Sequence, residues 1–257
     1  RDFLRVINNP KDFVIGFFCQ LLLLPIVAYI LILILNLPVE IALGIMIIAA
    51  APGGVTTNVM TKFANGDVAL SISLTAIISL ISIISVPFIV LKSADLLGVT
   101  NISADITMTA ITLKMALVVT VPVILGMIIR KFADNLISSN ISIVNKITTA
   151  LFVIVFAAIW IEERENIFNY LKQAGFAVLV LNVVMMILAY YIAKFFATGM
   201  KQRKCITIEC GLQNGTLAVF VATQMFNDIT YMIPTAAYAL IMYLTGFALI
   251  FILRRAN

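Results

Sequence analysis

Long apolar runs, separated by short polar stretches, fill almost the whole chain. A helix that crosses a bilayer needs about 20 predominantly apolar residues. Residues such as Pro10, Asn36 and Asp67 mark where the runs begin or end. The pattern predicts eight membrane-spanning segments, at residues 12–36, 39–64, 67–91, 105–130, 143–162, 166–196, 200–225 and 229–253. We therefore expect an all-α polytopic membrane protein whose main surroundings are the lipid bilayer.

The composition agrees with an outer surface that faces lipid. Of the 257 residues, 63% are hydrophobic and 11% are charged, whereas soluble domains have about 25% charged residues. The chain has no histidine, which excludes imidazole zinc sites and Ser-His-Asp catalysis. No pair of general acid and base is recognisable, so we expect no enzyme. The three cysteines, Cys19, Cys205 and Cys210, lie in or beside apolar runs, and we interpret them as packing residues.

Lysine and arginine are divided unevenly between the two sides of the membrane. If the chain crosses at each segment, thirteen of the 17 fall on one side and three on the other, and Lys114 lies inside a segment. Cytoplasmic loops are the ones rich in these residues. We therefore expect a multi-pass protein of the cell (inner) membrane with both ends of this chain in the cytoplasm. The net charge of +5 then reflects orientation, and we expect no nucleic acid partner.

The second and seventh segments contain residues that are unusual in a lipid-facing helix. The second has Pro52-Gly53-Gly54 at its middle, and the seventh has Gly211 and Gly215 on either side of two amides. Proline removes a backbone donor, and glycine tolerates dihedral angles that other residues avoid. Unwound backbone survives at membrane depth only where protein or a wet cavity satisfies it. Both segments are therefore predicted to be broken helices.

Glu209 is the one acidic residue that the segments place deep in the bilayer. A charge at that depth costs roughly 2.5–3.5 kcal/mol on insertion scales, so either something offsets that cost or the residue is protonated. Gln213 and Asn214 follow within five residues. At a helix break, amino-terminal ends favour an anion, while freed carbonyls and carboxylates favour a cation. We interpret Glu209 as a functional residue.

The two broken segments occupy matching places in two halves of the chain. Each is the middle member of a triple, at 12–91 and at 166–253, and the triples start on opposite sides of the membrane. The pair of segments at 105–162 lies between them. Interrupted segments in matching positions of inverted halves indicate a transporter binding site. The expected fold class is an inverted-repeat transporter with two crossing broken helices.

Several of these motifs also have simpler structural interpretations. The Pro52-Gly53-Gly54 run could be a kink, and serine and threonine hydroxyls could bond back to their own helices. Gln20 and Asn182 could join neighbouring helices, and Lys114 could snorkel or pair with a carbonyl. None of these interpretations accounts for Glu209 close to two amides.

The sequence resembles the bile acid:sodium symporter family, particularly its bacterial members. The resemblance rests on Pro52-Gly53-Gly54 followed by Thr57-Asn58, and on Glu209-x-Gly211-x-Gln213-Asn214. It covers essentially the whole chain, through Gln20 in the first segment and Lys114-Met115, Pro122 and Gly126 in the fourth. Members have a core domain with two crossing broken helices, which implies a core at 12–91 and 166–253, and a panel domain, which implies panel helices at 105–162. The implied function is sodium-coupled symport, by alternating access, of an organic anion that is bile-acid-like or a smaller carboxylate.

The resemblance also implies where the ions and the substrate would bind. One sodium ion would lie near Thr57, Asn58, Ser71, Thr75 and Glu209. The second would use Glu209, Gln213, Gln20 and the backbone carbonyls of Cys210 and Leu212. Such oxygen ligands suit a hard cation. The organic anion would face Gly54, Val55, Thr56, Asn214, Gly215 and Thr216.

The sequence departs from the family in the number of its segments. Members have ten helices, whereas this sequence predicts eight, and the missing pair is the first, which belongs to the panel. Because the first residue is Arg1, we expect either that the sequence lacks its natural beginning or that the panel is smaller by two helices. In the second case the substrate would lose one wall of its site.

A proton-coupled or exchange transporter of the same architecture is the alternative function. Cation/proton exchangers of this kind usually carry paired acidic residues at the crossing, whereas Glu209 stands alone in its segment. An arsenite-type efflux protein would be expected to have a cysteine beside the first break, where this sequence has Gly53-Gly54-Val55. A membrane-embedded enzyme or a purely structural protein would leave Glu209 without a role.

Overall fold

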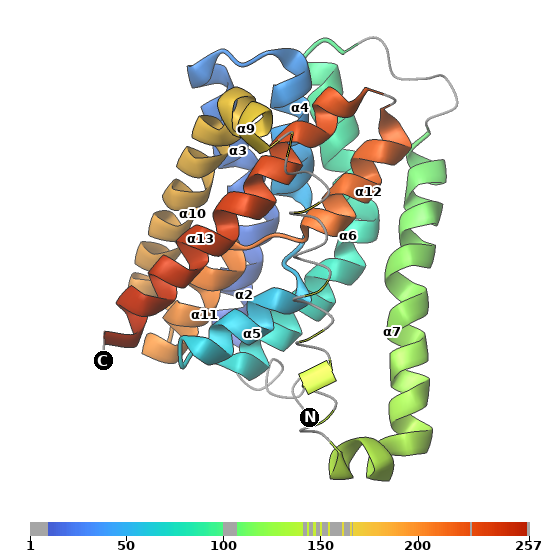
Figure 1. The fold of residues 1–257 in the computed structure, drawn as a ribbon. Coiled ribbons are helices and arrows are strands. Elements are labelled where there is room, and N and C mark those ends of the chain that lie inside the picture. The colour runs from blue at the N-terminus through green and yellow to red at the C-terminus, as the bar shows by residue number, and fades with distance from the viewer. Residues whose placement is uncertain are drawn as a thin grey trace.

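A computed structural model of the chain describes residues 10–99, 107–140, 167–226 and 228–255, and isolated positions between 143 and 165. The described residues form helices joined by short connections (Figure 1). In chain order the elements are α2 (Pro10–Phe18), the π-helical turn η1 (Cys19–Leu23), α3 (Leu24–Leu35), α4 (Val39–Ala50), α5 (Val55–Phe63), α6 (Val68–Leu96), α7 (Met108–Ser139), α9 (Ile167–Tyr170), the π-helical turn η2 (Leu171–Gly175), α10 (Phe176–Phe196), α11 (Met200–Gly211), α12 (Gly215–Met225), the 3-10 turn η3 (Ile229–Met232) and α13 (Ile233–Arg255).

The membrane character that the sequence predicts is confirmed. Six spans in the described residues are long and apolar enough to cross a bilayer, and the bent pair of α4 and α5 makes a seventh. These seven match seven of the predicted segments. The remaining segment, 143–162, lies mostly outside the described residues, so the count of eight stays a prediction.

Close packing, rather than water exclusion, holds helices together in lipid, and small residues let the backbones approach here. A Cβ atom on Gly16 of α2 would lie 2.7 Å from Leu74 of α6. A Cβ atom on Gly44 of α4 would lie 2.5 Å from the carbonyl oxygen of Tyr231. The centre of the bundle is filled by fully buried apolar side chains, among them Leu43, Ile47, Leu74, Leu181, Met185 and Ile206.

α7 lies at the edge of the bundle, at the right of Figure 1, and contacts α6 and α12. Ile111 and Met115 are buried, while Leu113 and Leu117 are exposed, as expected for a helix with one face against protein and the others toward lipid. The helix runs to Ser139, beyond the predicted end at 130, with a bend at Ala133 (φ −123, ψ 23). Lysine and arginine are good helix formers, so the basic pair at 130–131 marks no helix end.

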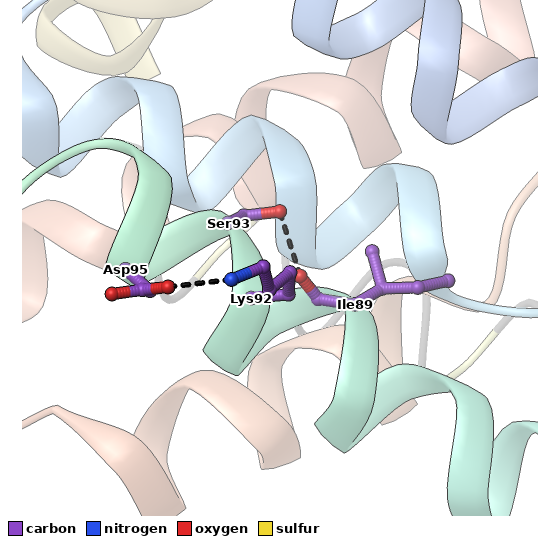
Figure 2. A network of polar contacts seen from close by, with 4 residues as sticks. All are labelled: Ile89, Lys92, Ser93 and Asp95. Atoms are coloured by element: carbon purple, nitrogen blue, oxygen red, sulfur yellow. Dashed lines mark hydrogen bonds and ion pairs between the residues drawn. The ribbon is translucent and has the colours of Figure 1, made fainter.

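α6 also extends beyond its predicted end at residue 91. Its last turn is held by an ion pair of 2.6 Å between Lys92 Nζ and Asp95 Oδ2, and the Ser93 hydroxyl donates to the carbonyl of Ile89 at 2.7 Å (Figure 2). Charged residues three apart on a helix support each other in this way. The helix continues to Leu96.

Candidate functional site

The two predicted breaks are present, and they contact each other. Residues 51–54 separate α4 from α5, with a bend of 67°, and residues 212–214 separate α11 from α12. The backbone N–H of Asn214 donates to the carbonyl of Pro52 at 2.8 Å. A Cβ atom on Gly54 would lie 3.8 Å from the Cα atom of Asn214. The ends of four half-helices are thereby brought to one place.

Local chemistry explains where each helix ends and begins again. Ala51 is extended (φ −66, ψ 146), as is usual for a residue before proline. Gly54 is the N-cap of α5 and is also extended (φ −104, ψ 171). In the second break Leu212 is extended (φ −113, ψ 119), and Asn214 caps α12 by accepting from the Leu217 N–H at 3.0 Å.

The carboxylate of Glu209 lies at this crossing and is fully buried. Its Oε1 accepts from the hydroxyls of Thr57 on α5 and Ser71 on α6, both at 2.5 Å. The Thr75 hydroxyl lies 3.3 Å from each carboxylate oxygen. Ser71 is also 2.8 Å from Oδ1 of Asn58. The structure therefore brings together all five residues predicted for the first ion.

This cluster has more neighbouring oxygens than hydroxyl protons. Thr57 carries one hydroxyl proton, yet its oxygen lies 2.7 Å from the Gly54 carbonyl and 3.3 Å from the Thr75 hydroxyl, besides its contact with Glu209. Ser71 likewise has one proton for two acceptors. Some of these oxygen pairs therefore meet lone pair to lone pair. A cation between them would turn that repulsion into coordination, and oxygen-only ligands suit a hard cation.

Two buried amide side chains adjoin the same glutamate. Nε2 of Gln20 donates to the backbone carbonyl of Glu209 at 3.1 Å, and Nε2 of Gln213 donates to the carbonyl of Cys210 at 3.2 Å. Among the described residues, the amide oxygens Oε1 of both glutamines are buried without a hydrogen-bond partner. An unsatisfied buried oxygen costs about 1–3 kcal/mol. Both oxygens, with the carbonyl of the unwound Leu212 nearby in sequence, are suited to a second cation.

A π-helical turn and a missing side chain allow Gln20 to approach Glu209. In η1 the N–H of Leu24 donates to the carbonyl of Cys19, and the following Pro25 has no N–H of its own. A Cβ atom on Gly53 would lie 2.6 Å from Oε2 of Glu209 and 2.8 Å from Nε2 of Gln20. Such π turns are frequent at functional sites. This turn was not predicted from the sequence, in which Pro25 was the available signal.

The residues predicted to face the substrate lie at the amino-terminal ends of α5 and α12. Val55 is 68% exposed and Thr216 is exposed, Thr56, Asn214 and Gly215 are partly exposed, and Gly54 is buried. The first amides of a helix have no acceptor within the helix, and its dipole is positive at that end. Two such ends side by side favour an anion.

Two buried side chains that were not predicted as site residues support the second break. Nδ2 of Asn182 donates to the carbonyl of Gly211 at 2.6 Å, and the Tyr238 hydroxyl donates to the same oxygen at 3.0 Å. Both side chains are fully buried. The suggested role of Asn182 as a link between helices is confirmed. Nothing in the sequence marks Tyr238 as a site residue except that its hydroxyl group lies within an apolar run.

We expect Tyr238→Phe to lower the free energy of unfolding by about 1 kcal/mol, because the Gly211 carbonyl loses one of two buried donors. Chemical unfolding in detergent measures this. Tyr191→Phe is the matched control: Tyr191 is 52% exposed, and its change should stay within about 0.5 kcal/mol. Equal effects of the two substitutions would show that the hydroxyl of Tyr238 does not support the break.

The cysteines are buried, as packing residues should be. Within the described part of the chain, no group of three or more histidine, cysteine, aspartate or glutamate side chains could hold a metal ion. The groups at the crossing that could hold a cation are one carboxylate and the hydroxyl, amide and carbonyl oxygens around it.

The chain is similar in sequence to a family of known transporters. The sequence model of the Sodium Bile acid symporter family matches residues 1–170. The chain is 30% identical over 250 residues to an uncharacterized sodium-dependent transporter, YocS, of Bacillus subtilis (strain 168), covering 95% of this chain and 74% of that protein. It is 27% identical to the "Probable sodium/metabolite cotransporter BASS1, chloroplastic" of Arabidopsis thaliana, covering 99% of this chain and 62% of that protein. It is 28% identical to the similarly named BASS2 of Oryza sativa subsp. japonica, with coverage of 96% and 58%.

Proposed function

The chain belongs to the sodium bile acid symporter family, and from that premise we propose that it is a sodium-coupled symporter of an organic anion. The observation that carries the proposal is the fully buried carboxylate of Glu209, set among hydroxyl oxygens where two broken helices meet. The relatives described above are named as transporters and not as enzymes. A bile-acid-like molecule or a smaller carboxylate is the substrate that we propose.

The first sodium ion would bind between Glu209 and the hydroxyls of Thr57, Ser71 and Thr75, with Asn58 completing the set. The support is the shortage of protons among these oxygens. When the ion enters, each hydroxyl rotates its proton away and directs a lone pair to the metal. The ion also neutralises a carboxylate that has no positively charged partner among the contacts described here.

The second sodium ion would bind between Glu209, Gln20, Gln213 and the carbonyls of Cys210 and Leu212. Its support is the pair of buried amide oxygens that lack a donor. Because Glu209 would serve both ions, the two binding events would be coupled through one charge. The binding of one ion would also order the break against which the other binds.

Sodium binding would prepare the site for the organic anion. Two sodium ions and one carboxylate leave a net positive charge beside the amino-terminal ends of α5 and α12. A carboxylate placed there meets this charge, the helix dipoles and the free amides together. Sodium and substrate would then strengthen each other's binding, with a typical coupling of about 1–3 kcal/mol.

We also propose the membrane arrangement that the sequence predicts. Eight crossings would divide into a core, at 12–91 and 166–253, and panel helices, at 105–162. The excess of basic residues on one side supports a cytoplasmic position for both ends of this chain in the cell (inner) membrane. The position of α7 at the edge of the bundle is compatible with a panel that rocks against the core.

Thermal unfolding of the purified protein tests sodium coupling. We expect sodium to raise the midpoint of unfolding in a saturable way, since an ion that binds the folded state stabilises it by mass action. Potassium at equal ionic strength should have no comparable effect, and lithium serves as a second control. Stabilisation of the same size by all three ions would contradict the proposal, and a response to pH instead of sodium would favour the proton-coupled alternative.

Gln213→Leu is expected to leave one sodium site and remove the other. Its side chain keeps a similar volume but has no oxygen to bind a cation. The dependence of anion uptake on sodium concentration should change from sigmoidal, as two coupled ions require, to hyperbolic. Gln202→Leu is the control. Gln202 lies near the start of α11, and its side-chain amide donates to Asp67. A curve of unchanged shape in Gln213→Leu would contradict the second site.

A further inference from the structure

Lys114 is a charged residue within an apolar span, and its partner is uncharged. It lies six residues after the start of the span Met108–Gly126, and its Nζ donates to Oε1 of Gln224 at 2.7 Å. A neutral amide does not cancel the charge of an ammonium. An ionisable residue at membrane depth indicates function by default, and here the missing partner is an anion.

The ammonium lies between two helices and is accessible there. The next residue, Met115, is fully buried, so this level of α7 packs against the bundle. Gln224 belongs to the last turn of α12, which α7 contacts. Lys114 is exposed and Gln224 is partly exposed. The charge is therefore in reach of a solute that lies between α7 and α12.

The same face of α12 connects Lys114 to the proposed anion site. Thr216, Val219 and Thr223 are exposed, and their spacing of three and four residues places them on one face of the helix. Thr216 lies at the amino-terminal end of α12, and Gln224 follows eight residues later, roughly 12 Å away at 1.5 Å per residue. This face is polar at both ends and apolar at Val219.

We propose that Lys114 binds a second acidic group of the substrate, so that the preferred substrate is an elongated dianion such as a dicarboxylate. The inference rests on the proposed function and names its substrate class more closely. One acidic group would lie at the amino-terminal ends of α5 and α12, and the other would take the place of Gln224 at Lys114. Two sodium ions and Lys114 against one Glu209 carboxylate leave two positive charges, which a dianion neutralises.

The test compares straight-chain α,ω-dicarboxylates with monocarboxylates of equal length. Chains of about eight to twelve carbons span the length of the α12 face. In sodium, thermal stabilisation titrated with each acid gives the apparent Kd. The wild type should bind the diacid more tightly than the monoacid. Lys114→Gln should weaken diacid binding on the order of 10- to 100-fold, as expected for loss of a charged hydrogen bond, and should change monoacid binding by less than about twofold.

Two matched variants sharpen the comparison. Lys92→Gln removes an exposed lysine that pairs with Asp95 in its own helix, and it should not change the preference for the diacid. Gln224→Leu removes the amide that competes for Lys114 and keeps the ammonium, so the preference should be retained. If the wild type shows no preference for the diacid, or if Lys114→Gln weakens both acids equally, the inference is wrong.

Sodium-dependent stabilisation measured without any acid distinguishes a failure of the substrate assignment from a failure of the proposed function. It should be present in the wild type and in Lys114→Gln, because Lys114 is not a sodium ligand. If it is present and the diacid preference is missing, the substrate assignment fails and the sodium site stands. If the wild type does not respond to sodium at all, the proposed function itself fails.

Discussion

Glu209→Gln is expected to abolish both sodium-dependent uptake and sodium-dependent stabilisation. The substitution keeps the shape of the side chain and removes the one negative charge that both ions share. At about 4 Å and an effective dielectric constant of about 20, one pair of unit charges interacts by about 4 kcal/mol. Loss of that attraction corresponds to roughly a thousandfold weaker binding of each ion. Uptake of a radiolabelled acid and thermal unfolding, each measured across a sodium series, provide the test.

The same variant carries a second expectation, in sodium-free medium. A buried carboxylate without a cation is costly, whereas a neutral amide with hydroxyl neighbours is not. Without sodium, Glu209→Gln should therefore be at least as stable as the wild type, which excludes misfolding as the cause of its inactivity. Glu40→Gln, at the far end of α4 from the break, is the control and should keep its sodium response. Wild-type sodium dependence in Glu209→Gln would refute the assignment.

Gly53→Ala is expected to have the second largest effect, although it adds a single methyl group. That group would lie 2.6 Å from Oε2 of Glu209 and 2.8 Å from Nε2 of Gln20. Both atoms are the ends of flexible side chains, and a shift of either would change the separation of the carboxylate and the amide between which the second ion would bind. We expect sodium affinity to fall on the order of 10- to 100-fold, which corresponds to the 1–3 kcal/mol typical of overpacking.

Gly126→Ala is the matched control for this substitution. A Cβ atom there would meet nothing within 4 Å, and alanine is a better helix former than glycine. Its sodium affinity should equal that of the wild type, and its stability should be equal or slightly higher. The close approach at Gly53 would be irrelevant to ion binding if both alanine variants had wild-type sodium affinity.

Much of the fold could be predicted because a bilayer leaves the chain few choices. Apolar length alone located seven spans that the structure contains, and proline and glycine located both breaks. Helix ends were less predictable. The segment predicted to end at residue 91 continues to Leu96, and the ion pair of Lys92 with Asp95 lies in the added turn of α6. A charge indicates where lipid ends, whereas a helix ends where its backbone hydrogen bonds do.

The residues of the candidate site were likewise predictable only in part. Glu209 could be found from its cost at membrane depth, and the resemblance supplied Thr57, Ser71, Thr75 and Gln20. What the sequence could not provide were contacts between distant segments. Tyr238 reaches the Gly211 carbonyl across 27 positions of chain, and no local pattern marks such a pair.

A pair of structures, one determined in sodium and one in potassium at equal ionic strength, would examine the crossing most directly. With sodium we expect a density peak coordinated by Oε1 of Glu209 and the hydroxyl oxygens of Thr57, Ser71 and Thr75, and no such peak with potassium. A sodium-bound structure in which these oxygens only bond one another, with any ion located away from Glu209, would contradict the account.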